Sequence, residues 1–181
     1  MEADRSRRWT ALIIRIAEEY RILPASERQW IDPRLERIAR LQQQLQDLFR
    51  HADGDRHCRI CQGDCCAKGH NHMTLPNLLG YLSRGELPPP ADFSGTCPFL
   101  GLRGCLLDVE RRPYNCVTFI CDTIENALSP QDIERFYSLD QQLRTIYLDF
   151  AARYRGAAMT GLLLQEQRLA GKSFFTLIEA I

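Results

Sequence analysis

The chain has 181 residues, enough for one ordinary domain with a hydrophobic core. Its hydrophobic fraction of 45% and charged fraction of 25% are those of a globular protein, which excludes an intrinsically disordered chain. The 23 basic and 23 acidic side chains cancel, so bulk charge attracts neither nucleic acid nor an anionic membrane. We therefore predict one domain over residues 1–181, with no nucleic-acid or membrane partner.

No segment is typical of export or of a membrane span. The N-terminal stretch places basic residues before apolar ones, but Arg15, Glu18 and Glu19 interrupt it and no small-residue cleavage site follows. No apolar run reaches the roughly 18–20 residues that a bilayer requires. The sequence therefore predicts a cytoplasmic protein, and in that reducing compartment stable disulfides are disfavoured.

Two amphipathic helices are predicted within residues 1–54. The first ends at Pro24, and its apolar residues recur at intervals of three and four. For the second, we expect Asp32 to be the cap, Pro33 the first helical position and Gly54 the terminator. The apolar stripe of this second helix consists of Leu35, Ile38, Leu41, Leu45, Leu48 and Phe49.

The middle segment, residues 55–122, has a different composition. Its glycines and the run of prolines at 88–90 leave room only for short elements, the clearest being a helix after Thr74. Such a segment is expected to bury little apolar surface, while ordering it costs about 1–2 kcal/mol per residue in backbone entropy. We expect metal–thiolate bonds to supply the missing stabilisation.

Residues 123–181 read as helical again. Ser129 is a predicted cap, Pro130 a predicted first position and Gly156 the end of a helix with an aromatic face. A further short helix and an apolar end follow. The predicted fold class is mainly α, a small helical bundle packed on an irregular cysteine-rich metal-binding middle segment.

All eight cysteines lie in that middle segment, and thiols so concentrated indicate zinc, an iron–sulfur cluster or disulfides. Spacings of three and four residues direct the thiols of Cys58, Cys61 and Cys65 to one side of a helix or tight loop. Cys105 and Cys121 stand beside apolar residues, so each has the alternative of a small hydrophobic core side chain. The predicted metal ligands are Cys58, Cys61, Cys65, Cys66, Cys97, Cys105, Cys116 and Cys121.

Other polar residues flank the cysteines. His57, His70 and His72 are interpreted as solvated loop histidines because the cysteines already suffice as ligands. Arg112 either donates hydrogen bonds to metal-bound thiolates or lies in solvent, and Arg111 is expected in solvent. The sequence has no phosphate-binding glycine loop and no nucleophile elbow, so no catalytic residue is predicted.

The cysteine motifs resemble the YkgJ-type cysteine-cluster family, described as a zinc- or iron-chelating domain and related to flagellin lysine N-methylases. The matching motifs are CRICQGDCC from Cys58, CPFL from Cys97, the Gly104-Cys105 step and RPYNCVTFIC from Arg112 to Cys121. Residues 62–64 stand where the family pattern has two residues, and Val117 stands where it has arginine. The resemblance covers residues 58–121 and implies thiolate ligation of zinc or iron.

The metal and the number of centres stay open at this stage. Eight thiols divide into two tetrathiolate zinc sites, whereas one iron–sulfur cubane needs only four. The predicted function is therefore a cysteine-ligated metal-binding protein, with an iron–sulfur cluster or Zn²⁺ needed to fold the middle segment. The alternatives are a cluster-dependent protein-modifying enzyme, such as a lysine N-methylase, and a zinc-shaped protein-interaction module. The protein partner or substrate is unknown.

Overall fold

The computed structural model describes residues 2–61, 64, 73–95, 97–102 and 104–179. Over these residues the chain forms eight α-helices, two short 3-10 turns and one two-stranded hairpin. The prediction of a mainly α protein is therefore confirmed. Within the same residues, no helix combines the length and the apolarity that crossing a membrane requires.

The two N-terminal helices are α1 (Glu2–Arg21) and α2 (Ala25–His51). The predicted start of the second helix was wrong, because α2 begins at Ala25 and Pro33 lies inside it. Proline lacks the N–H that would complete one helical hydrogen bond. Packing outweighs that loss, since Ile31 is fully buried and the ring of Trp30 meets the ring of Phe150 edge-on at 5.1 Å.

Gly54 begins a helix instead of ending one, which corrects the second boundary. Helix α2 stops at His51, and Asp53 adopts the left-handed conformation, with φ of 53°. Helix α3 (Gly54–Ile60) then begins directly over the ring of Phe49. A Cβ atom at position 54 would stand 2.5 Å from Cζ of Phe49, so glycine is required here for close approach.

Helix α4 (Leu75–Leu82) lies in the hydrophobic core, and the helix predicted after Thr74 is confirmed. Leu75, Leu78 and Leu79 have no exposed surface. The expectation that residues 55–122 bury little apolar surface is therefore wrong for this part of the segment. The glycines and prolines on either side mask an eight-residue helix that is apolar on most of its circumference.

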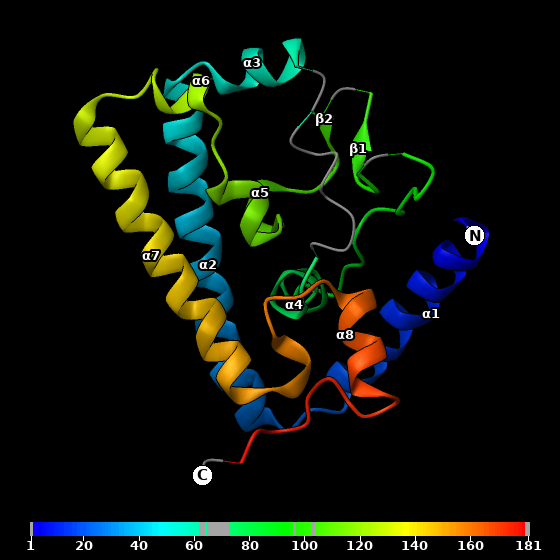
Figure 1. The fold of residues 1–181 in the computed structure, drawn as a ribbon. Coiled ribbons are helices and arrows are strands. Elements are labelled where there is room, and N and C mark those ends of the chain that lie inside the picture. The colour runs from blue at the N-terminus through cyan, green and yellow to red at the C-terminus, as the bar shows by residue number, and fades with distance from the viewer. Residues whose placement is uncertain (1, 62–63, 65–72, 96, 103, 180–181) are drawn as a thin grey trace.

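Helix α7 (Pro130–Arg153) runs antiparallel beside α2, as Figure 1 shows. Its predicted start is confirmed, because the Ser129 hydroxyl accepts a hydrogen bond of 3.1 Å from the Asp132 amide. Helix α8 (Leu162–Leu169) packs on α1, on the other side of the molecule. Helices α4 and α8 lie between α1 and the α2–α7 pair, so the long helices do not form one simple bundle.

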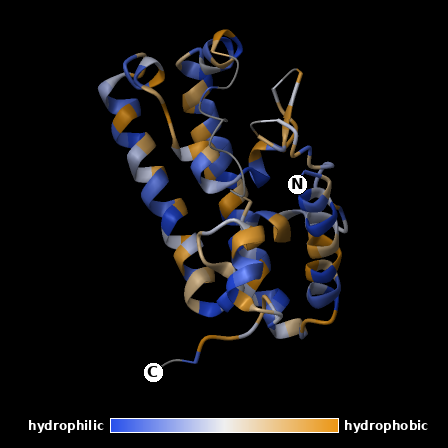
Figure 2. Ribbon diagram, turned by 45° about the vertical axis from the view of Figure 1, so that its right-hand side comes forward, coloured by the Kyte–Doolittle hydropathy of each residue, from blue (hydrophilic) through white to orange (hydrophobic). Residues whose placement is uncertain are grey.

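The remaining elements are short and connect α4 with α7. They are β1 (Leu100–Gly101), β2 (Gly104–Cys105), the 3-10 turn η2 (Val109–Arg111), α5 (Tyr114–Thr118) and α6 (Asp122–Glu125). The strands are antiparallel, with Leu100 opposite Cys105. Figure 2 shows apolar and polar residues alternating along the long helices, as expected for helices that bury one face.

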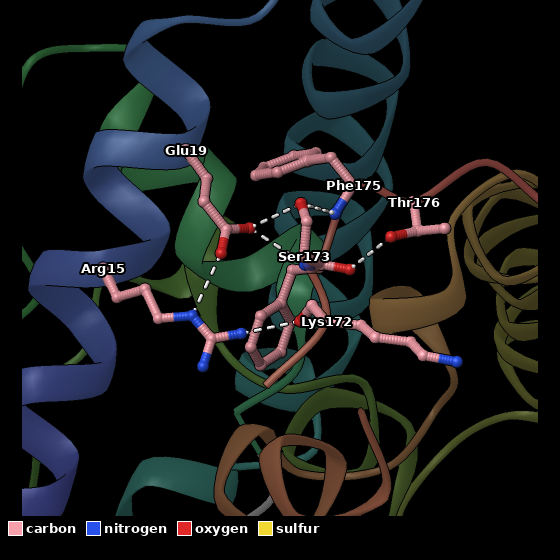
Figure 3. A network of polar contacts seen from close by, with 7 residues as sticks. Arg15, Glu19, Lys172, Ser173, Phe175 and Thr176 are labelled. Atoms are coloured by element: carbon pink, nitrogen blue, oxygen red, sulfur yellow. Dashed lines mark hydrogen bonds and ion pairs between the residues drawn. The ribbon is translucent and has the colours of Figure 1, made fainter. Parts of the chain in front are cut away.

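The C-terminal stretch is fastened to α1 by the polar contacts drawn in Figure 3. The Glu19 carboxylate accepts hydrogen bonds from the Ser173 hydroxyl at 2.8 Å and from the Phe174 amide at 2.9 Å. One turn earlier in α1, Arg15 donates to the Lys172 carbonyl oxygen at 2.7 Å. These bonds hold the fully buried Phe174 ring in the core, beside Arg15 and Glu19 of α1.

Candidate metal centre

Six of the eight cysteines belong to the described residues, and they are spread over several short elements. Cys58 lies in α3, Cys61 directly follows it, and Cys97 packs against the core. Cys105 lies in β2, Cys116 in α5, and Cys121 directly precedes α6. The predicted ligands Cys65 and Cys66 lie outside the described residues, as do His70 and His72, which were interpreted as solvated.

Four of the six described cysteines are solvent-exposed, namely Cys61, Cys105, Cys116 and Cys121. Cysteine is among the residue types most often buried, and structural cysteines usually behave as small hydrophobes. Exposure therefore excludes a core-packing role for these side chains. The core alternative considered for Cys105 and Cys121 was wrong, because neither side chain reaches the hydrophobic cluster.

Two separated stretches of the cysteine pattern meet at one end of the α2–α7 pair. Helix α3 packs against α6, which places Cys58 and Cys61 on an element adjoining that of Cys121 (Figure 1). The Cys61 thiol lies 3.6 Å from the Cys58 carbonyl oxygen, within hydrogen-bond distance for sulfur. A shared thiolate centre would need the first and last cysteine motifs to converge, and the contact between α3 and α6 brings the neighbouring chain segments together.

The described side chains do not complete a coordination shell by themselves. Among them, no group of three or more His, Cys, Asp or Glu residues could hold a metal ion, and no disulfide joins two described cysteines. The donor chemistry fits, since soft thiolates bind zinc and iron–sulfur clusters. The metal centre thus stays a prediction that depends in part on Cys65 and Cys66.

Cys105 and Cys116 each lie close to a buried tyrosine. Burial, with smaller contributions from nearby Asp108 and Cys105, raises the pKa of Tyr81 in α4 to about 12. Burial also raises the pKa of Tyr147 in α7 far above its ordinary value, with Cys116 adding to the effect. These two cysteines therefore stand next to different core helices, Cys105 near α4 and Cys116 near α7.

Arg112 anchors the loop that leads into α5. Its Nε donates to the Leu107 carbonyl oxygen at 3.2 Å and its Nη1 to Gln46 at 3.3 Å. Its own carbonyl oxygen accepts hydrogen bonds from Gln42 in α2 at 2.7 Å and from Asn77 in α4 at 2.8 Å. Arg112 thus ties the segment before Cys116 to two core helices. A contact between Arg112 and a metal-bound thiolate stays a prediction.

Arg111 was expected in solvent, and this prediction was wrong. The side chain is buried, with Cζ 4.4 Å from the centroid of the Tyr81 ring. It donates a hydrogen bond to Glu86 and pairs with Asp108 at 3.4 Å. The Arg111 hydrogen bond holds the pKa of Glu86 below its ordinary value. A partner 25 residues away gives no local signal, which is why sequence reasoning missed the pairing.

Asn77 is the central polar residue that the sequence analysis missed. Its Oδ1 accepts from the Thr74 amide at 3.1 Å and from the Thr74 hydroxyl at 2.7 Å. Its Nδ2 donates to the Arg112 carbonyl oxygen and, at 2.7 Å, to the Tyr147 hydroxyl. The available signal was its place three residues after a threonine cap, where a capping box puts a polar side chain.

Comparison with known proteins adds no relative. Scans of the chain against protein-family models, curated proteins and solved structures found no match. The resemblance of the cysteine motifs to the YkgJ-type family therefore depends on the residues named above alone.

Proposed function

We propose that this chain is a metal-binding protein whose centre is an iron–sulfur cluster or Zn²⁺ held by cysteine thiolates. The observation that carries the proposal is the exposure of four cysteines on short elements, since packing does not explain them. The adjoining positions of α3 and α6 support a ligand set drawn from both halves of the cysteine pattern. The resemblance to the YkgJ-type family supports the same chemistry.

The proposed role of the metal is to order the cysteine-bearing elements outside the core. Helix α5 has no buried residue, and both residues of β2 are exposed. By contrast, α4 is held by core contacts and by the hydrogen bonds of Asn77, neither of which involves a cysteine. Removal of the metal is therefore expected to loosen residues 54–61 and 100–122, while residues 73–82 stay protected.

The test begins with protein purified without oxygen. We expect iron with sulfide and a brown absorption band, or stoichiometric zinc in a colourless sample. Cys58→Ser should lower the metal content, since a hydroxyl is a poor substitute for a thiolate. Arg59→Ser, an exposed change on the next residue of α3, is the matched control and should leave the metal content unchanged. Anaerobic protein with neither iron nor zinc would refute the proposal.

One observation favours a second candidate, a zinc-shaped protein-interaction module. Large apolar side chains are exposed on the elements that carry the cysteines, including Ile60 at 68%, Phe119 at 59% and Leu106 at 52%. A contiguous patch of exposed apolar side chains is typical of an interaction surface, and these three would contribute to one if they adjoin. A colourless protein with stoichiometric zinc would favour this candidate over the iron–sulfur centre. Heat release on titration with S-adenosylmethionine would favour the lysine N-methylase alternative instead.

A further inference from the structure

A surface hollow of about 320 Å³ lies where α2, α7 and the C-terminal stretch meet. Trp30 and Arg34 of α2 line it on one side, and Asp149 and Arg153 of α7 on the other. Along the α2 axis, Trp30 and His51 are about 30 Å apart at the helical rise of 1.5 Å per residue. The hollow is thus remote from α3, which follows His51 and carries the first cysteines.

Two guanidinium groups lie against the indole ring in this hollow. The Cζ atoms of Arg34 and Arg153 are 3.8 Å and 4.7 Å from the centroid of the Trp30 ring. Glu27 holds the Arg153 guanidinium in place, because Nη2 and Nε of Arg153 donate to the two Glu27 carboxylate oxygens at 2.6 Å and 2.9 Å. The Arg153 guanidinium is therefore positioned in advance, and its Nη1 has no hydrogen-bond partner among the described residues.

Arg34 has an unused donor within the same hollow. Its Nη1 donates to the Trp30 carbonyl oxygen at 3.1 Å. Its Nε is buried and makes no hydrogen bond within the described part of the chain, although an Asp149 carboxylate oxygen lies 3.5 Å away. The Asp149 ion pair leaves this donor without a well-formed hydrogen bond, and a bound anion would supply one.

The part of the lining that comes from the C-terminal stretch is apolar. Leu177 and Ile178 line the hollow and expose 50% and 42% of their surface. Two arginines and one aspartate line the hollow, and Glu27 pairs with Arg153 from outside the lining, so these charges balance. The arginine N–H groups that have no hydrogen-bond partner among the described residues are what favours an anion. The volume lies at the lower end of the range of about 300–1,000 Å³ that is typical of ligand sites, so the ligand is small.

We propose that this hollow binds a small aliphatic carboxylate. The carboxylate accepts hydrogen bonds from Arg34 and Arg153, and the aliphatic part of the ligand lies against Leu177 and Ile178. A free short-chain acid and the C-terminal carboxylate of an apolar peptide share this chemistry. Hexanoate and N-acetylleucine are the probes for the two sources, and hexanol and N-acetylleucinamide are their neutral counterparts.

Titration calorimetry with the full chain tests the proposal, and Trp30 fluorescence locates the binding. Trp9, the other of the two tryptophans, is buried in the core and supplies a constant background of fluorescence. We expect saturable binding of at least one acid at millimolar concentration, a change in Trp30 emission, and no binding of the neutral counterparts. The acid that binds identifies the source of the ligand.

Variants assign the binding to the hollow. Arg34→Gln should weaken the acid by roughly tenfold or more, the factor expected for a lost charge-assisted hydrogen bond. Arg37→Gln, an exposed change one turn along the same helix, should leave the affinity unchanged. Ile178→Asp places a negative charge on the apolar part of the lining and should also weaken the acid, which keeps the test valid if Arg34→Gln does not fold. Absence of saturable binding, equal binding of a neutral counterpart, or full affinity in both site variants would overturn the proposal.

Discussion

Replacing Asn77 with alanine tests whether one buried amide joins the cysteine-bearing segment to the core. Asn77 is 2% exposed and makes four hydrogen bonds to three partners in α4, α7 and the loop before α5. Alanine leaves the Thr74 amide, the Thr74 hydroxyl and the Tyr147 hydroxyl without this partner. The Arg112 carbonyl oxygen keeps its bond from Gln42.

The expected loss of stability follows from these orphaned groups. Each buried polar group that loses its partner costs about 1–3 kcal/mol. The three groups share one side chain, and water can enter the vacated space, so the costs do not add fully. We therefore expect Asn77→Ala to lower the free energy of unfolding by about 3–5 kcal/mol. Tyr147→Phe removes only one of the bonds and should cost about 1 kcal/mol.

Urea unfolding followed by far-UV circular dichroism measures both effects. Asn115→Ala, at an exposed asparagine of α5, is the matched control and should change stability by less than about 0.5 kcal/mol. Trypsin cleavage after Arg111 should become faster in Asn77→Ala, because the loop loses one of its two carbonyl anchors at Arg112. If the free energy of unfolding of Asn77→Ala is within about 1 kcal/mol of the wild-type value, the hydrogen bonds of Asn77 are not a main source of stability.

Two further predictions concern Gly156 and the Glu27–Arg153 pair. Gly156→Ala should lower the free energy of unfolding by about 1–3 kcal/mol, because the added Cβ would stand 2.6 Å from the backbone of Phe174. Gly95→Ala is the control in the same calorimetric measurement and should be neutral, because the nearest atom to its added Cβ is 3.9 Å away. The Arg153 hydrogen bonds hold the pKa of Glu27 below its ordinary value of 4.5, so their stabilisation is complete above that pH and is lost as pH falls through the lowered pKa. Glu27→Gln should therefore lower the melting temperature at neutral pH and match the wild type in strong acid; an equal difference at both pH values would contradict this account.

Local signals were sufficient for the helices that have clear caps. Thr74, Ser129 and Pro130 mark helix starts that the structure confirms. The start of α2 was missed because burial of Ile31 outweighs the usual effect of Pro33, and a local pattern does not report tertiary packing. The burial of α4 was missed for a related reason, since composition averaged over a long segment conceals one short apolar helix.

The candidate site, like the fold, was predictable from the sequence only in part. The spacing of the cysteines singled out the residues, but their exposure and the meeting of α3 with α6 depend on long-range contacts. The Arg111–Glu86 pair and the Asn77–Arg112 bond join residues that are 25 and 35 positions apart. Because their partners are not visible in the local sequence pattern, Arg111 and Asn77 resembled ordinary polar surface residues.

The fastening of α1 to the C-terminal stretch has a consequence for biosynthesis. The Glu19–Ser173 and Arg15–Lys172 contacts span 154 and 157 residues. At a translation rate of about 5–20 residues per second, roughly 8–30 s pass between the synthesis of α1 and the synthesis of these partners. During that interval its apolar face, including Leu12 and Ile16, lacks the C-terminal part of the core to which Phe174 belongs. The nascent chain should therefore depend on chaperones that shield an early amphipathic helix until synthesis is almost finished.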